Sequence, residues 1–268
     1  GNYLVILNFF LPLKTFLSFF IFLLIFFSYK YPPSVDIYKK LVINLPVYLI
    51  LLVSSYNISY HYDAGLYHLN NQHLIRENNI ILGISNIYGP YGVGSIYEYI
   101  SSFFWFDNTF VILHFLNVLF AGFFFNFIFK LIFKSESNVL KNIGIALLLF
   151  SILDNFGYLG GRNGLIYFQG IGKQDIAISV LFLLTVIIII YNIRNHNHTS
   201  LDIFIISLLA LFIYQLKVSG VMIFVFYVFY IAYLARRKIL KKKYINSTLV
   251  PIIFGFIWIL KSVLTTGC

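Results

Sequence analysis

Asp63 is the side chain of this sequence that is best suited to acid–base chemistry. His68, Gln72 and Arg76 follow it at four-residue spacing, which on a helix places them in one polar stripe. A carboxylate in such surroundings can accept a proton from a substrate hydroxyl, while nearby cations stabilise an anionic leaving group. We therefore predict that Asp63 is catalytic. The substrate-binding residues predicted around it are His61, His68 and Gln72.

Asp63 also has a structural interpretation. The segment 64–77 has the polar spacing of a short helix lying near an interface, and aspartate is a favoured N-cap immediately before a helix. On spacing alone, capping and catalysis both stay open, and one carboxylate is able to serve both roles.

The histidines of this region raise the question of a metal site. His61, His68 and His73 lie close to Asp63 in the sequence, and imidazole and carboxylate groups bind zinc or manganese. The tight spacing of a motif such as H-E-x-x-H is missing. We therefore predict no resident metal or other cofactor, and a divalent ion that arrives with the substrate stays open.

A second group of charged residues lies in the later part of the chain. Arg162 and Lys173 belong to the polar segment 160–174, and Asp175 then opens an apolar helix, where the helix dipole favours a negative charge. Lys217 lies in a short turn between two apolar segments. Cations at a membrane boundary can bind a phosphate or diphosphate, although a structural role at a helix end explains each one alone. The residues predicted here to bind substrate are Arg162, Lys173, Asp175 and Lys217.

The composition of the chain decides its class. Of its residues, 60% are apolar and only 10% are charged, whereas a water-soluble domain carries about 25% charged residues. So few charges cannot cover a water-exposed surface, so most of the surface must face lipid. The single cysteine, Cys268, can form no disulfide within the chain.

Apolar stretches recur along the chain at lengths suited to membrane helices, which need about 20 residues. They lie near 3–28, 41–56, 109–133, 142–159, 175–192, 201–216, 218–235 and 247–264. Pro12 and Lys14 interrupt the first stretch. The stretches 201–216 and 218–235 can form a helical hairpin, which requires a tight turn near Lys217. We predict an all-α, polytopic transmembrane helical bundle that forms a single domain over 1–268. Because the sequence begins at Gly1 without Met, we expect a fragment of a longer protein.

Basic residues gather in alternate loops between these stretches. They are Lys30, Lys39, Lys40, Lys130, Lys134, Lys141, Arg194 and the run 236–243. The positive-inside rule places such loops in the cytoplasm, so we interpret the run 236–243 as a topology anchor and predict no nucleic-acid partner. The opposite, outer side then carries the long loop 57–108 with its short interfacial helix. Membrane lipids are the predicted surroundings.

Glycine and aromatic residues mark the second half of this outer loop. Gly83, Gly89, Gly92 and Gly94 lack the strand-to-helix context of a phosphate-binding loop, so we predict turns at the membrane surface. The aromatic residues that we interpret as interfacial are Tyr88, Tyr91, Tyr97, Tyr99 and Trp105.

The block DAGLYHL, residues 63–69, resembles the D-x-G-L-Y-H-x-Q loop of an uncharacterised family of bacterial polytopic membrane proteins. That family is similar to the GT-C class of membrane glycosyltransferases. The likeness continues at Gly83 and Asn86, with Tyr88 where the family has histidine, and at the K-x-S of Lys217. The stretch 258–267 (WILKSVLTTG) resembles a helix of the family.

The resemblance implies a GT-C-like fold, a multi-pass location in the bacterial inner membrane and a catalytic role for Asp63. It also implies a polyprenyl-phosphate sugar as donor. We therefore expect a membrane glycosyltransferase that acts at the outer face on an envelope glycan or lipid acceptor. A transporter or flippase for a polar or lipid-linked solute is the alternative, although the charges cluster at helix ends and not at mid-membrane. A non-catalytic scaffold of envelope assembly is a third hypothesis.

Overall fold

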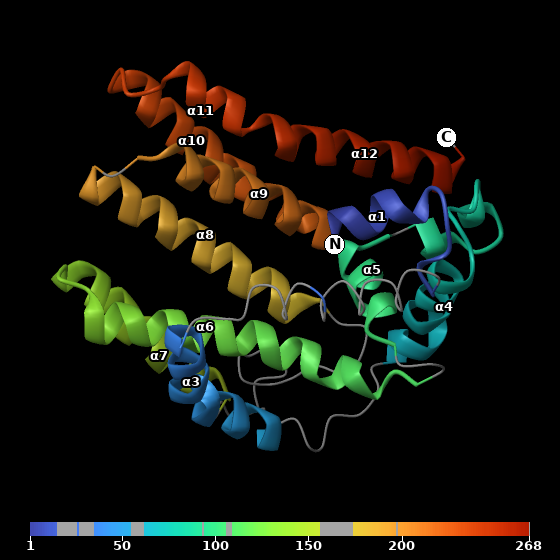
Figure 1. The fold of residues 1–268 in the computed structure, drawn as a ribbon, viewed down its shortest axis with the longest axis horizontal. Coiled ribbons are helices and arrows are strands. Elements are labelled where there is room, and N and C mark those ends of the chain that lie inside the picture. Colours follow the sequence, from blue (N-terminus) through green and yellow to red (C-terminus); the bar gives the residue numbers. More distant parts are fainter. Residues whose placement is uncertain are drawn as a thin grey trace.

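The structure, a computed structural model, describes residues 1–14, 26, 35–54, 62–92, 94–105, 109–155, 174–196 and 198–267. Every regular element in these ranges is a helix, which confirms the all-α prediction. The helices form an elongated bundle with its long axis horizontal in Figure 1. The long helices are α3 (Val35–Ser54), α6 (His114–Lys134), α7 (Asn138–Asn155), α8 (Asp175–Asn195), α9 (Ser200–Leu216), α10 (Ile223–Arg236) and α12 (Leu249–Thr266).

Four helical stretches within the described residues are long and apolar enough to cross a membrane. They are Phe115–Lys134, Asp175–Asn195, Val218–Arg236 and Lys242–Thr266, and shorter apolar helices cover Asn138–Ser151 and Ser200–Leu216. Large apolar side chains such as Phe229 and Phe256 lie exposed on this surface, as expected of a lipid-facing protein. The predicted multi-helix membrane architecture therefore agrees with the structure.

The first predicted apolar stretch is divided. Helix α1 (Asn2–Asn8) ends before Pro12, in agreement with the predicted interruption, since proline cannot continue the hydrogen-bond ladder of a helix. Most of the remainder, 15–25 and 27–34, lies outside the described residues.

The predicted hairpin around Lys217 is present, and local chemistry explains its limits. A reciprocal capping box begins α9, in which Thr199 Oγ1 accepts the N–H of Asp202 at 3.1 Å and the Asp202 carboxylate accepts the N–H of Thr199 at 2.9 Å. Lys217 is extended (φ −161°, ψ 142°) and ends the helix. A short 3₁₀ turn, η5 (Val218–Met222), then leads into α10.

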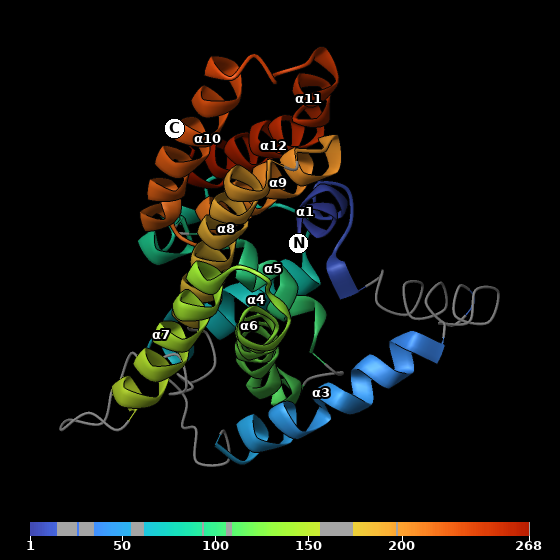
Figure 2. The same cartoon turned by 90° about the vertical axis from the view of Figure 1, so that its left-hand side faces the viewer.

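Two groups of long helices share the bundle. Helix α6 contacts α3, α7 and α8, whereas α9 contacts α8, α10 and α12, so that α8 joins the two groups (Figure 2). The core of the first group contains Phe124, Ile128 and Val180. The core of the second group, toward the other end, contains Ile203 and Tyr230.

The two ends of the bundle differ in chemistry. The α6–α7, α8–α9 and α10–α11 connections, with most of the basic residues, lie at the left end in Figure 1, where α11 (Lys242–Ser247) begins. The right end carries the residues of the predicted outer loop. These form a π-helical turn η1 (Ala64–His68), α4 (Leu69–Glu77), two 3₁₀ turns η2 (Ile84–Asn86) and η3 (Gly89–Gly92), and α5 (Ile96–Phe103). The predicted grouping is therefore found for these three turns, whereas Lys39 and Lys40 belong to α3 and Lys30 lies outside the described residues.

Candidate functional site

Asp63 lies at the start of an unusual helical turn. The predicted short helix is present, but its first turn is π-helical: Leu69 N–H donates to the carbonyl of Ala64, five residues earlier. Such turns are rare and are frequent at functional sites. Asp63 itself has helical backbone angles (φ −64°, ψ −21°) and its side chain caps no N–H of the helix, so the capping interpretation is wrong.

Tyr67 lies between the Asp63 carboxylate and the buried residues His68 and Glu98. The Tyr67 hydroxyl hydrogen-bonds to Asp63. Burial raises the pKa of Tyr67, and the negative charges of Asp63 and Glu98, together with this hydrogen bond, raise it further. Tyr67 therefore stays a neutral hydrogen-bond donor at physiological pH. Its ring centroid is 4.2 Å from that of His68.

The predicted polar stripe of His68, Gln72 and Arg76 exists, but it faces inward and is buried against α5. Gln72 Oε1 accepts the indole N–H of Trp105 at 2.8 Å. Arg76 Nη1 donates to the carbonyls of Ser102 and Trp105 at 3.0 and 3.1 Å. The stripe thus positions α4 on α5, and its first member, His68, contacts the titratable side chain of Glu98.

Glu98 is the centre of this buried layer, and the sequence analysis missed it. Its side chain is 2% exposed, it accepts a hydrogen bond from Asn71, and its Oε1 lies 2.8 Å from Nδ1 of His68. A buried carboxylate requires such partners because desolvation penalises its charge. Glu98 is the single acidic residue of the aromatic helix IYEYISSF, and that isolation was the available signal.

Lys261 is the second residue that the sequence analysis passed over as a site. It belongs to the apolar helix α12, is only 3% exposed, and its Nζ lies 4.9 Å from the ring centroid of Trp258 and 5.7 Å from that of Tyr99. Among the described residues, no acceptor lies within hydrogen-bonding or ion-pairing distance of Nζ. An ionisable residue within an apolar helix was the signal that could have identified it.

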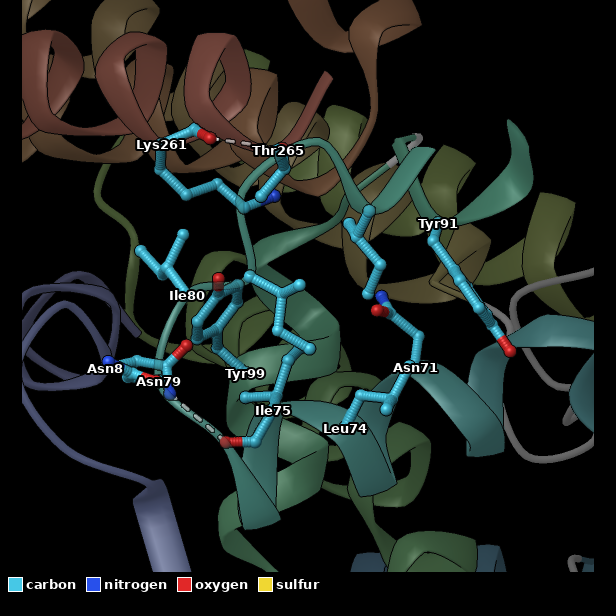
Figure 3. A pocket seen from close by; sticks show the side chains of 12 residues that line it. Asn8, Asn71, Leu74, Ile75, Asn79, Ile80, Tyr91, Tyr99, Lys261 and Thr265 are labelled. Atoms are coloured by element: carbon cyan, nitrogen blue, oxygen red, sulfur yellow. Dashed lines mark hydrogen bonds between the residues drawn. The ribbon is translucent and has the colours of Figure 1, made fainter. Parts of the chain in front are cut away.

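A small cavity lies between Lys261 of α12 and the helices α4 and α5 (Figure 3). It measures about 30 Å³. Lys261 reaches into it from α12, Tyr99 from α5 and Asn71 from α4. Pockets for drug-sized ligands measure about 300–1,000 Å³, so this cavity has room for a compact group and not for a sugar ring. None of the described residues that line it is acidic.

Three hydrogen bonds fix this end of the molecule, two of them to long helices and one to α1. Ser95 Oγ donates to the carbonyl of Leu216 at 2.7 Å, which ties α5 to the end of α9. Gly83 N–H donates to the carbonyl of Leu264 in α12 at 2.8 Å, and Asn8 Nδ2 donates to the carbonyl of Ile75 at 3.1 Å. The site is therefore built on the rigid bundle.

Two of the residues predicted to bind substrate, Lys217 and Asp175, form an ion pair with each other. Lys217 Nζ lies 2.8 Å from Oδ1 of Asp175, and the two side chains are 48% and 36% exposed. Asp175 is in the first turn of α8, where the helix dipole favours its charge as predicted. Arg162, Lys173 and His61 lie outside the described residues.

The interfacial interpretation is wrong for Tyr97, Tyr99 and Trp105, which are buried. Tyr97 donates its hydroxyl to Oδ1 of Asn117 at 3.0 Å and packs in the core formed with α6 and α12. Tyr88 is exposed, as an interfacial residue would be. The predicted glycine turns are present as η2 and η3, with Gly83 left-handed at φ 63°.

No three His, Cys, Asp or Glu side chains gather as a metal site in the described ranges. His68 is directed to Glu98, and His73 lies exposed on the other side of its helix. A larger hollow of about 560 Å³ lies at the opposite, basic end. The charged residues that line it, Lys130, Lys134 and Glu136, are all exposed. Among the described residues, the buried acidic, basic and histidine side chains are therefore at the Asp63 end; they are His68, Arg76, Glu98 and Lys261.

Comparison with known proteins places the chain in a family without naming a reaction. Neither the curated proteins nor the solved structures gave a significant match. One family model, described as a domain of unknown function (DUF8201), matches residues 2–268, so the chain belongs to that family.

Proposed function

We propose that this chain is the membrane domain of a glycosyltransferase of GT-C type. It transfers a sugar from a polyprenyl-phosphate donor to an envelope glycan or lipid acceptor at the outer face of a bacterial inner membrane. The observation that carries the proposal is the partly buried Asp63 carboxylate, held on a π-helical turn at the end of the bundle opposite the basic turns.

Asp63 is suited to the role of general base. Tyr67 holds its carboxylate from one side through a hydrogen bond, and as a neutral hydroxyl it leaves the negative charge on Asp63. In the proposed step the acceptor hydroxyl loses its proton to Asp63 while its oxygen bonds to the anomeric carbon of the sugar. The bond from that carbon to the phosphate oxygen breaks, and polyprenyl phosphate leaves.

The neighbouring residues have positioning roles in this scheme. Glu98 holds His68 at 2.8 Å and also accepts from Asn71, which fixes the turn that carries Asp63. The partly exposed Lys217, paired with Asp175, supplies positive charge at the ends of α9 and α8 that point away from the basic turns. The exposed apolar surface of the bundle allows a lipid-linked donor to approach from the bilayer.

The test compares the purified full-length protein with its Asp63→Asn variant on a panel of polyprenyl-phosphate sugars. We expect donor turnover to fall by about 10²–10⁴-fold in the variant, the usual contribution of a general base. Glu77→Gln is the matched control, because Glu77 is an exposed carboxylate at the end of the same helix, paired only with Lys14 at the surface.

Equal turnover in wild type and Asp63→Asn would refute the catalytic assignment. Solute uptake in proteoliposomes without sugar transfer from any donor would instead favour the transporter hypothesis.

A further inference from the structure

The amine of Lys261 lies in the interior at the Asp63 end of the molecule, with its side chain only 3% exposed. It has aromatic rings on two sides but no acceptor among the described residues, and both oxygens of Glu98 are occupied by His68 and Asn71. A buried charge without a hydrogen-bonding partner is strongly unfavourable. The cavity into which Lys261 projects is therefore the place where a partner is required (Figure 3).

The lining of that cavity selects an anion. Besides Lys261, its lining includes Tyr99 and the amides of Asn71 and Asn79, although Asn71 also donates to Glu98, and none of its described lining residues is acidic. Burial raises the pKa of Tyr99, and the charge of Glu98 raises it further, so its hydroxyl stays a donor. A cation surrounded by donors matches an oxyanion with several acceptor atoms.

Gly94 leaves open the space that the end of the Lys261 side chain occupies. A Cβ atom added to Gly94 would fall on Nζ of Lys261. The backbone of Gly94 is not left-handed, so the absence of a side chain here provides space and not conformational freedom.

We propose that this cavity is a phosphate-binding site in which Lys261 and Tyr99 hold the phosphate group of a polyprenyl-phosphate substrate. Its volume of about 30 Å³ suits one compact oxyanion while the sugar lies outside. Helix α12 exposes the apolar residues Phe256, Ile259 and Leu260 just before Lys261, which gives the lipid chain an apolar path to the site. The assignment of the phosphate to a polyprenyl lipid rests on the proposed function. The recognition of a phosphate group by this cavity does not depend on that function.

Trp258 provides the direct readout, because its ring is 4.9 Å from Nζ of Lys261. The intrinsic fluorescence of the full chain is titrated separately with inorganic phosphate and with a polyprenyl monophosphate that carries no sugar. Trp258→Phe identifies which part of the signal comes from this residue. We expect saturable quenching or enhancement with the polyprenyl phosphate, and weaker binding of inorganic phosphate.

Two variants remove the ammonium from the site in different ways. Lys261→Met keeps the length of the side chain without its charge, and Gly94→Ala keeps the charge but displaces it. Each is expected to weaken binding by about tenfold or more, the loss for one charge-assisted hydrogen bond. Gly89→Ala is the matched control, since a Cβ there meets nothing within 4 Å.

Thermal unfolding separates this role from a structural one. Lys261→Met should unfold no earlier than wild type without ligand, because it removes an uncompensated buried charge, and it should lose the stabilisation that phosphate confers. Early unfolding without ligand, together with unchanged phosphate affinity, would overturn the proposal in favour of a water-bridged Lys261–Glu98 contact. Absence of binding by either ligand would overturn it as well.

The two ligands also separate the possible outcomes. Lys261-dependent binding of inorganic phosphate without binding of polyprenyl phosphate would contradict the claim that the phosphate belongs to a polyprenyl lipid. Lys261-dependent binding of polyprenyl phosphate with no sugar transfer from any donor would support this site while rejecting the proposed transferase.

Discussion

At the scale of single residues, Glu98 joins the η1 turn and α4 to α5, beside the hydrogen bonds that Gln72 and Arg76 make there. Its carboxylate accepts from Asn71 and lies 2.8 Å from His68 of the neighbouring helix, with almost no access to water. Removal of one member of such a group leaves the others buried without a partner, which costs more than the intact interaction contributes. The contribution of Glu98 to stability is therefore best measured by replacing its side chain with that of alanine.

We predict that Glu98→Ala lowers the free energy of unfolding by about 3 kcal/mol or more, because His68 and Asn71 lose their buried acceptor. Chemical unfolding in detergent, followed by helical circular dichroism, measures this change. Glu136→Ala is the control, as Glu136 is an exposed carboxylate at the opposite end and should change stability by less than about 0.5 kcal/mol. Equal stability of the two variants would contradict the central role of Glu98.

At the scale of elements, the α9–η5–α10 hairpin determines how the second group of helices meets the site. Its turn brings Lys217 to Asp175, and the end of α9 accepts the hydrogen bond of Ser95 from α5. Gly220 in this turn lies against the backbone carbonyl of Ile213, and an added Cβ would clash with it. A backbone atom inside a helix cannot move aside as a flexible side chain can.

We predict that Gly220→Ala destabilises the protein by about 1–3 kcal/mol, the usual cost of overpacking. Thermal unfolding in detergent provides the measurement. Gly255→Ala is the matched control within α12, because its Cβ would make only an ordinary contact, 3.4 Å from Cδ1 of Leu211. A Gly220→Ala protein as stable as the control would show that the hairpin tolerates a wider turn.

At the scale of the whole molecule, the separation of charge between the two ends predicts an orientation in the membrane. The basic turns are at one end, and α4 with the outer-loop turns is at the other, while Asp175 and Lys217 lie at the ends of α8 and α9 that point away from the basic turns. From this separation, the positive-inside rule predicts that the candidate site faces the outer side of the membrane.

Single-cysteine labelling tests this orientation. In a Cys268→Ser background, we expect Ser219→Cys, at the exposed turn near the site, to react with a membrane-impermeant maleimide in intact spheroplasts. Glu136→Cys, in the α6–α7 turn, should react only after lysis, and the background without added cysteine should not react at all. The reverse pattern would place the site in the cytoplasm and exclude an outer-face transferase.

The helices themselves could be predicted from the sequence, because the length and apolarity of a segment are local properties. The stretches near 175–192 and 201–216 correspond to α8 and α9, and the turn at Lys217 lies where the pattern required it. The spacing of His68, Gln72 and Arg76 also predicted their shared helical face. Periodicity could not show that this face is buried, since that depends on where α5 packs.

The candidate site depended on the tertiary structure for the same reason. Glu98 meets His68 from a separate helix, and Lys261 reaches Tyr99 from the far end of the chain. Residues so distant in sequence come together through helix packing, which no local pattern encodes. The sequence by itself thus determined that this is a helical membrane protein with its polar chemistry around Asp63, whereas only the packing of α4, α5 and α12 decided which charges are buried together there.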